Sequence, residues 1–423
     1  MPKYFLDIIL LLILFNFSAG QKREKSDNTC STQPNIVNKN CFTDIIQFNQ
    51  KDYSYGRSVI SEEGDLIIEY SLDSDHLERL FYGIKSDGRN YFSDNSFIKV
   101  INLDNDGKDK HRKESINCIT KIEDCKTGNI VPRIISITSS CIEIYDPDIS
   151  SCYCYDTNDD FKSQVKFYQG FENNGEYYFG ANVFVDYEYK LRIYKLKGDT
   201  IECEVYIAYD IYRDTAISLF KINDNQINCI YLDRSNNFRY AYYYMSGGSS
   251  ISFFYSIPRT FENIFYKAIL LNNYFALIYL NDNNDNTFII ADFEETIKFN
   301  RNFYTDKLNP NPSLNDFIKY DDYRLALISN KNENNLDIFL FFLNSDYSGM
   351  KVNHYSYLLN NYKLKEISAT FWNNYLVFMP SYTTDNISKH SFLLIFGFAN
   401  GTDSIIDISL FLNDIDNQNS DIT

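Results

Sequence analysis

The sequence predicts an all-β fold in which one small antiparallel sheet is repeated around a ring. The chain has 423 residues, with 36 Tyr and 34 Phe but only 16 Gly and 8 Pro, and aromatic residues favour pleated strands. Because glycine is scarce, Asn and Asp must build most tight turns, and both tolerate the left-handed conformation that such turns require. A third observation is that one type of segment recurs along the chain.

The recurring segment consists of a short apolar stretch, an Asn or Asp turn and a second apolar run. The turns of the five clearest copies stand at Asn173, Asn223, Asn272, Asp321 and Asn373. Two weaker copies place their turns near Gly64 and Gly128. The spacing of the clear copies is about 50 residues, and periods of about 40–50 are typical of ring-shaped repeat folds.

Each copy contains enough sequence for a small sheet. In one copy, the apolar run 274–280 is followed by a polar loop and a second run at 287–293, and three or four such strands form one propeller blade. Sheets stacked around a ring bury both faces, which explains continuous apolar runs. The sequence therefore predicts a seven-bladed β-propeller of four-stranded antiparallel blades over residues 41–412. A β-sandwich, a β-solenoid and a chance spacing are the alternatives.

In pattern and period, the chain resembles the β-propeller superfamily, and in outline it resembles exported or cell-surface propeller ectodomains of protozoa. It has no Gly-His…Trp-Asp pair of the WD type, and Gly247-Gly248 is not followed by the Tyr and Trp of the kelch type. The resemblance therefore transfers no catalytic residue and no cofactor site, and no cofactor is expected.

The first 20 residues have the layout of a secretory signal peptide. Lys3 precedes an apolar run at 8–17, and small residues at 18–20 suit cleavage. The run is too short to span a bilayer, which takes about 20 residues. We therefore expect a signal over 1–20, a disordered lead over 21–40 and a polar tail over 413–423. The mature chain is expected to be secreted or extracellular without a transmembrane segment, or attached to the cell surface if it belongs to a longer ectodomain.

All nine cysteines lie between Cys30 and Cys229, and export makes disulfide bonds the first interpretation. The expected pairs are Cys30–Cys41, Cys118–Cys125 and Cys141–Cys152, with Cys203–Cys229 as a weaker candidate and Cys154 or Cys152 left over. No metal site is expected, because Cys152 and Cys154 lack the usual Cys-x-x-Cys spacing and no His is near.

Asn386 and Asn400 begin Asn-x-Ser/Thr sequons and are the glycosylation candidates.

Other candidate chemistry is weaker. Residues 102–113 resemble the start of a calcium loop, but Lys113 stands where a bidentate Glu is required. Acidic clusters at 155–161, 280–286 and 320–323 offer carboxylate pairs for glycoside hydrolysis, although Asp and Asn also build turns. The aromatic segments 177–189 and 238–246 are interpreted mainly as strand packing.

The net charge of −17 disfavours nucleic acid and anionic membranes as partners. We expect an exported or cell-surface binding module that recognises protein or glycan through loops on one propeller face, without catalysis. The alternative is a secreted glycoside hydrolase or lyase with a carboxylate pair in the propeller channel, so the sequence leaves enzymatic activity open.

Overall fold

The structure is a computed structural model that describes strands, and many of the turns between them, from Thr43 to Gly397. Side chains are described mainly between Gly170 and Leu376. The described backbone covers residues 43–46, 53–60, 66–72, 78–85, 98–102, 116–123, 130–137, 141–146, 151–156, 166–198, 200–208, 211, 217–244, 249–256, 264–283, 285–294, 296–332, 335–358, 363–372, 375–384, 388–391 and 393–397. Among these residues, no helix is long and apolar enough to cross a membrane.

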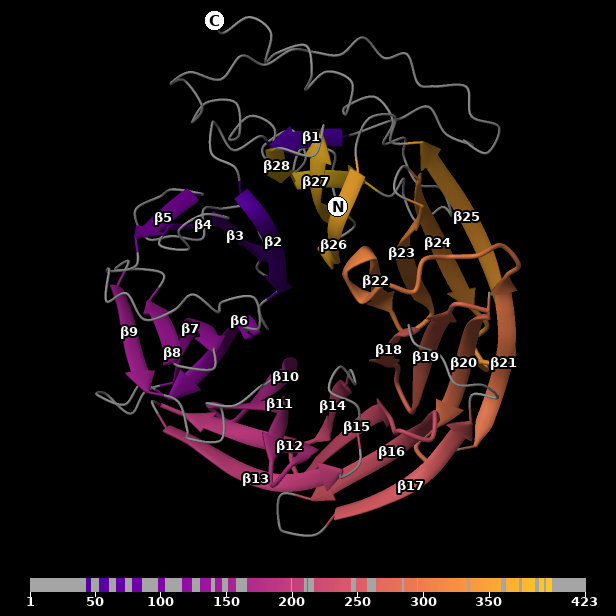
Figure 1. Cartoon of the computed structure of the whole chain (residues 1–423), viewed down its shortest axis with the longest axis horizontal. Coiled ribbons are helices and arrows are strands. Elements are labelled where there is room, and N and C mark those ends of the chain that lie inside the picture. The colour runs from indigo at the N-terminus through magenta and orange to yellow at the C-terminus, as the bar shows by residue number, and fades with distance from the viewer. Residues whose placement is uncertain are drawn as a thin grey trace, which may run out of the picture.

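The described strands form seven antiparallel sheets that follow one another around a ring (Figure 1). Six sheets, numbered here as blades 1 to 6, each contain four strands in sequence order. Blades 1 to 3 are β2 (Tyr53–Ile60), β3 (Leu66–Leu72), β4 (Glu78–Ile84) and β5 (Ile98–Asn102); β6 (Ile116–Glu123), β7 (Ile130–Ile137), β8 (Cys141–Asp146) and β9 (Ser151–Asp156); and β10 (Lys166–Asn173), β11 (Glu176–Val185), β12 (Glu188–Lys197) and β13 (Thr200–Ala208).

The next three sheets repeat this plan. Blades 4 to 6 are β14 (Ile217–Asn223), β15 (Gln226–Leu232), β16 (Asn237–Tyr244) and β17 (Ser249–Ser256); β18 (Ile264–Leu270), β19 (Tyr274–Asn281), β20 (Asn286–Asp292) and β21 (Ile297–Tyr304); and β22 (Asn315–Asp321), β23 (Arg324–Asn332), β24 (Asn335–Leu343) and β25 (Met350–Leu358). A short 3-10 helix, η3 (Pro312–Leu314), precedes β22. The first strand of each blade faces the centre of the ring (Figure 1). This is the predicted β-propeller, and its seven sheets fit the predicted number of blades.

The seventh sheet, blade 7, contains strands from both ends of the domain. It consists of β26 (Lys363–Trp372), β27 (Tyr375–Thr384), β28 (Ser388–Ser391), β29 (Leu393–Gly397) and β1 (Thr43–Ile46). In this sheet β1 pairs with β29, with Thr43 opposite Phe396, so the start of the domain closes the last blade. The predicted propeller extends to residue 412, and residues 398–412 lie outside the described residues.

The predicted turns connect the first two strands of the blades. β10 ends at Asn173, β14 ends at Asn223 and β22 ends at Asp321, while Asn272 lies between β18 and β19. In blade 3 the turn residues Asn174 and Gly175 have φ angles of 54° and 81°, the left-handed conformation that Asn and Gly tolerate. Asn and Asp therefore occupy these turns as predicted, but Asn223, Asn272 and Asp321 do not themselves have the left-handed conformation.

The core lies between neighbouring sheets. All residues from Phe275 to Leu280 in β19 are buried, which explains why this run does not alternate between apolar and polar. Between blades 5 and 6, the ring of Phe288 lies 4.9 Å from that of Phe341. Each large side chain buried in this way stabilises the fold by about 1.5–3 kcal/mol.

Hydrogen bonds with the period of the repeat connect the innermost strands. The Ala268 amide donates to Ser218 Oγ at 2.9 Å, and the Ala369 amide donates to Asp316 Oδ2 at 2.8 Å. Lys267 Nζ also lies 2.8 Å from Asp316 Oδ1. Asp316 on β22 therefore joins blade 6 to the blades on both sides of it.

The two aromatic segments mostly supply core side chains, as the sequence analysis expected. Tyr177 and Phe179 in the first segment, and Phe238 and Tyr240 in the second, are at most 2% exposed. The described exceptions are Tyr187, which is 94% exposed, and Tyr244, which is 42% exposed.

Candidate ligand-binding site

The described acidic clusters build turns. In the cluster 280–286, Asn281 Oδ1 accepts hydrogen bonds from the amides of Asn283 at 2.9 Å and Asp285 at 3.2 Å. Asn281 Nδ2 donates to the Asp285 carboxylate at 3.0 Å. The carboxamide of the buried Asn281 side chain therefore forms the hydrogen bonds of this turn, as in an Asx turn.

The cluster 320–323 uses its carboxylates in ion pairs. Asp321 Oδ2 accepts from Arg324 Nε at 2.6 Å, and Asp322 Oδ1 accepts from Lys319 Nζ at 2.6 Å. In the third cluster, only 155–156 fall within the described residues. Among the described residues, no group of three or more His, Cys, Asp or Glu side chains is placed to hold a metal ion.

The cysteines give two corrections. Cys229 on β15 is a free, buried thiol, and burial raises its pKa, so the weaker candidate pair Cys203–Cys229 is wrong. The pair Cys141–Cys152 does not fit the β8–β9 register, in which Cys141 lies opposite Asp156 and Cys152 lies opposite Tyr145. Four residues along a strand separate the two positions by about 13 Å, whereas a disulfide needs about 4.4–6.8 Å between Cα atoms.

The other predicted modification sites are not tested by the described residues. Cys118 lies on β6 opposite Ile135, and its expected partner Cys125 lies outside the described residues. Cys30, Cys41 and the two sequon residues also lie outside them; these sequon residues are Asn386 and Asn400. The pairs Cys30–Cys41 and Cys118–Cys125 and both glycosylation sites remain predictions.

Three tyrosines gather where the turns of blades 5 and 6 meet, and we name them the tyrosine patch: Tyr274, Tyr323 and Tyr347. The ring of Tyr347 lies 4.7 Å from that of Tyr274. It lies 5.5 Å from that of Tyr323, and these two planes are only 17° apart. Tyr347 is 4% exposed while Tyr323 is 41% exposed, so a buried ring supports an exposed one.

The turn between β24 and β25 holds Tyr347 in place. The Asn344 amide donates to the Gly349 carbonyl at 2.9 Å, and the Tyr347 amide donates to the Asn344 carbonyl at 2.9 Å. Asp346 Oδ1 accepts from both the amide and the hydroxyl of Ser348. Tyr347 has a φ of 57°, and this left-handed conformation costs a non-glycine residue about 1–2 kcal/mol. Strain of this kind is concentrated at functional sites.

The hydroxyl of Tyr347 is also unusual. Its oxygen is buried, and among the described residues no partner forms a hydrogen bond of normal geometry with it. Burial, and then the neighbouring Tyr323 and Asp322, raise the pKa of Tyr347 to about 12. A buried unsatisfied hydroxyl destabilises a fold by about 1–3 kcal/mol. The patch therefore contains a polar group that a ligand can satisfy.

Polar side chains surround the patch. Asn272 and Asn273 are exposed and directly precede Tyr274, and each carboxamide supplies both donors and an acceptor. Lys319 and Asp322 form an ion pair, and Asp322 directly precedes Tyr323. An exposed aromatic ring beside carboxamides and charged groups is suited to binding a ligand with both apolar and hydroxyl-rich surfaces.

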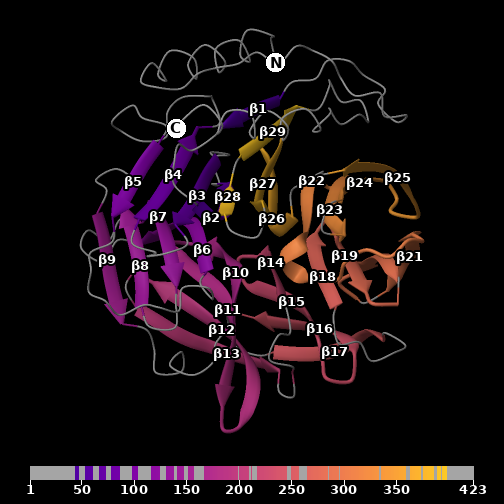
Figure 2. The same ribbon diagram turned by 45° about the horizontal axis from the view of Figure 1, so that its top comes forward.

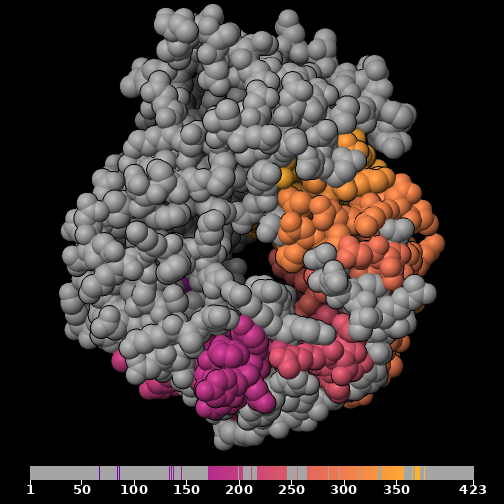
Figure 3. Space-filling view, in the orientation of Figure 1, coloured from indigo at the N-terminus to yellow at the C-terminus, as the bar shows by residue number. Residues whose placement is uncertain are grey.

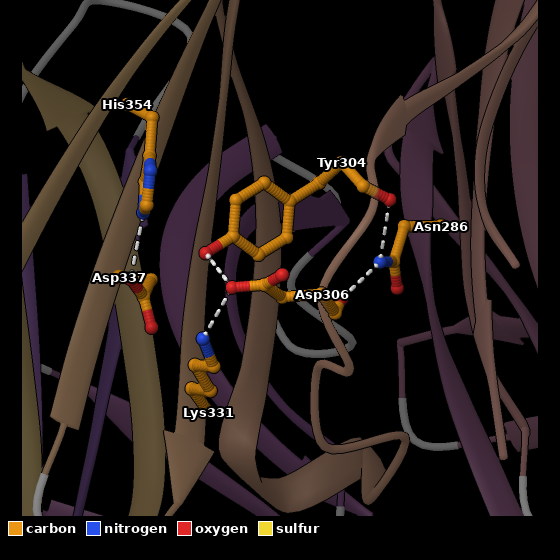
Figure 4. A network of polar contacts seen from close by, with 6 residues as sticks. All are labelled: Asn286, Tyr304, Asp306, Lys331, Asp337 and His354. Carbon is orange, nitrogen blue, oxygen red and sulfur yellow. Dashed lines mark hydrogen bonds and ion pairs between the residues drawn. The ribbon is translucent and has the colours of Figure 1, made fainter. Parts of the chain in front are cut away.

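A second group of polar residues lies between blades 5 and 6 (Figure 4). Asp306 Oδ2 accepts from Lys331 Nζ at 2.8 Å and from the Tyr304 hydroxyl at 3.3 Å. The hydrogen bond from Lys331 lowers the pKa of Asp306, and the same contact raises the pKa of Lys331. Asn286 Nδ2 donates to the carbonyls of Tyr304 and Asp306. These contacts fasten the segment after β21 to blade 6.

Behind this pair lies a buried carboxylate. Asp337 is 0% exposed, and its Oδ1 lies 2.6 Å from His354 Nε2. The His354 ring stacks on Phe339 with centroids 4.4 Å apart and planes 5° apart. Ser329 lies opposite Asp337 in the sheet, but its hydroxyl donates to Asn315 Oδ1 at 2.6 Å. The pair therefore orients no described nucleophile. Asp337 and His354 lie on adjacent strands of blade 6, so we interpret their contact as stabilising that blade, whereas the contact of Lys331 with Asp306 joins blades 5 and 6.

The tyrosine patch was not predicted from the sequence, although the sequence contains a pattern that marks it. Tyr274 follows Asn272-Asn273, Tyr323 follows Asp321-Asp322, and Tyr347 follows Ser345-Asp346. A tyrosine directly after a polar turn pair, repeated in neighbouring copies, places several rings at the same edge of the ring of sheets.

Comparison with known proteins finds similar solved structures but no family. No protein-family model matches the chain, and no curated protein matches it in sequence. The solved structures that are similar include AofleA from Arthrobotrys oligospora, at 10% identity over 75% of this chain and 92% of that one, with a TM-score of 0.42. A fucose-specific lectin from Aleuria aurantia has 10% identity over 72% of this chain and 96% of that one, with a TM-score of 0.44. The WD40 domain of coronin from Toxoplasma gondii has 7% identity over 86% and 89%, with a TM-score of 0.47.

Proposed function

We propose that this β-propeller is a binding module whose ligand contacts the tyrosine patch. One observation carries the proposal: Tyr347 is held in a strained left-handed turn beneath the exposed ring of Tyr323, and its buried hydroxyl interacts with Tyr323 without forming a hydrogen bond of normal geometry among the described residues. Folding alone gains nothing from this arrangement, because both the strain and the unpaired hydroxyl destabilise the native state. A ligand that packs on the Tyr323 ring and forms a hydrogen bond with the Tyr347 hydroxyl gains binding free energy from each of these two contacts.

A glycan is the ligand class that we favour, and a protein is the other predicted class. A sugar ring has an apolar face that packs on an aromatic ring, and hydroxyl groups that bond with carboxamides. Tyr323 provides the ring, while Asn272 and Asn273 provide exposed carboxamides in the neighbouring turn. Little reorganisation is needed on binding, because hydrogen bonds already fix the turn at 344–349.

Catalysis is not supported by a specific observation. The hydrolase alternative needs two carboxylates about 5–9 Å apart, one of them held protonated. The Asp285 carboxylate instead accepts from Asn281 Nδ2, the Asp321 carboxylate accepts from the Tyr323 amide and pairs with Arg324, and Asp322 pairs with Lys319. We therefore propose binding without a described catalytic pair.

We also propose that the module acts outside the cell, because residues 1–20 have the layout of a signal peptide. Sequencing the N-terminus of the chain collected from the medium of producing cells tests this point. A mature N-terminus near residue 21 supports export, and an intact N-terminus in a retained chain contradicts it.

The binding proposal is tested on a glycan array with the full secreted chain and two variants. Tyr323→Ala removes a ring that is 41% exposed, and the matched control Tyr244→Ala removes a ring that is 42% exposed in blade 4. We expect the wild-type chain to bind a restricted set of glycans, Tyr323→Ala to lose at least about tenfold in affinity, which is 1.4 kcal/mol, and Tyr244→Ala to bind normally. Equal losses in both variants, or no glycan binding by the wild type, would contradict the proposal.

A further inference from the structure

The hairpin between β11 and β12 is longer than its counterparts in the next two blades. Both strands have 10 residues, whereas the second and third strands have 7 and 8 residues in blade 4 and 8 and 7 in blade 5. The β11–β12 register is unbroken from Glu176 opposite Lys197 to Val185 opposite Glu188. A magenta hairpin of blade 3 extends past the ring in Figure 2, and magenta side chains lie on the viewer's face in Figure 3.

The tip of this hairpin has an unexpected residue. Asp186 and Tyr187 have φ angles of 55° and 67°, as in a two-residue type I′ turn, where glycine is the preferred second residue. The first hairpin of the same blade does use glycine, at Gly175. Tyr187 adopts the strained conformation while its side chain is 94% exposed, so the ring neither eases the turn nor contributes to the core.

The surroundings of Tyr187 are aromatic and acidic. Behind the tip, the rings of Phe184 and Tyr189 lie 4.9 Å apart and pair across the two strands. Asp186 and Glu188 flank Tyr187 and are both exposed, and Asp186 pairs with Lys190 at 2.8 Å. Two carboxylates and one ammonium leave the tip with a negative charge, in a chain whose net charge is −17.

The tip and the tyrosine patch belong to opposite faces of the ring. The tip connects the second and third strands of its blade, whereas the patch turns connect first to second strands and third to fourth strands. Because consecutive strands in a blade are antiparallel, these two kinds of turn lie at opposite ends of the sheets. The tip is therefore separate from the site of the proposed function.

We propose that Tyr187 is the anchor of a protein-docking site, and that the partner is a protein surface with an apolar pocket bordered by Lys and Arg. Aromatic side chains are the commonest energetic anchors of protein interfaces, and the two-residue turn holds this one at low entropic cost. The carboxylates on either side select a basic rim and disfavour an acidic one. The pair of Phe184 and Tyr189 supports the hairpin from behind.

The first test places a photoreactive benzoylphenylalanine at position 187 of the full chain in the cells that produce it. The matched control carries the same residue at position 244. Mass spectrometry then identifies the cross-linked peptides. We expect cross-links from position 187 to one partner, at a segment containing Lys or Arg beside apolar residues. Cross-links no more frequent than those from position 244, or cross-links to acidic surfaces, would overturn the proposal.

The second test uses the purified cross-linked partner. Tyr187→Gly suits the turn and relieves its strain, so this variant folds, and we expect about 30-fold weaker binding, the loss of a 2 kcal/mol anchor. Tyr187→Phe keeps the ring and is expected to bind within about threefold of the wild type. Unchanged binding by a folded Tyr187→Gly variant would overturn the role of Tyr187 even if the partner were real.

Discussion

The buried pair of Asp337 and His354 in blade 6 allows one stability effect to be worked out from the structure. Asp337 is 0% exposed, and its Oδ1 has His354 Nε2 as partner at 2.6 Å, while its Oδ2 has no hydrogen-bond partner among the described residues. The substitution His354→Phe keeps a ring against Phe339 but removes both ring nitrogens. The buried carboxylate then loses its hydrogen bond.

Removing the hydrogen-bond partner of a buried charged group destabilises a protein by about 3–5 kcal/mol. We expect the lower value, about 3 kcal/mol, because the His354 side chain is 30% exposed and water can replace part of the lost contact. The assay is urea unfolding at pH 7, followed by circular dichroism, with the free energy of unfolding extrapolated to water.

A second variant distinguishes the effect of the unpaired buried carboxylate on stability from the effect of lost packing. In His354→Phe, the additional change Asp337→Leu removes the buried charge, and we expect it to restore at least about 1 kcal/mol. The reasoning is refuted if His354→Phe changes the free energy of unfolding by less than about 1 kcal/mol. It is also refuted if the double variant is less stable than the single one.

Three further predictions concern stability and reactivity. Tyr347 has a pKa of about 12 against an ordinary value of 10.0, so wild-type stability falls as pH rises from 10 through 12. Because the buried hydroxyl already destabilises the fold, Tyr347→Phe should be the more stable protein, and urea unfolding should show its advantage growing over that interval; a constant difference would contradict this. The pKa of Asp306 is lowered, so its contribution is present above pH 3.8 and is lost as pH falls through the folded value; the difference between wild type and Asp306→Asn should shrink between pH 6 and pH 3, and a constant difference would contradict this. Cys229 is buried and its thiol pKa is raised, so a thiol reagent such as dithiobis(nitrobenzoic acid) should modify it in urea but not in buffer, as peptide mapping can check.

The sheets were predictable from the sequence, because the turn pairs at Asn173, Asn223, Asn272 and Asp321 recur at a nearly constant spacing and mark the first hairpin of each blade. The closing strand β1 was not, since Thr43–Ile46 is short and carries no copy of the repeat. Strand register was also out of reach. Register decides whether two cysteines on paired strands meet, and it places Cys141 and Cys152 apart.

The candidate site depended on features that a linear pattern does not contain. Tyr347 has its left-handed backbone because of hydrogen bonds within its own turn. The glycine of that turn stands at position 349, so the sequence does not indicate that Tyr347 adopts this conformation. Asp337 and His354 are 17 residues apart and lie on neighbouring strands of blade 6, so their contact follows from strand pairing and not from a sequence spacing. The exposed Tyr187 was not predicted, because it lies in the segment 177–189, which was interpreted mainly as strand packing.

The pairing of β1 with β29 also has a consequence for the biogenesis of the protein. Thr43 and Phe396 become neighbours although nearly the whole domain separates them, and joining such distant points of an unstructured chain costs about 5 kcal/mol of conformational entropy. The intervening blades must therefore assemble first and bring the two strands together. During synthesis, β1 emerges early and waits without its partner until Leu393–Gly397 has been made, so the ring is completed only after translation of almost the entire domain.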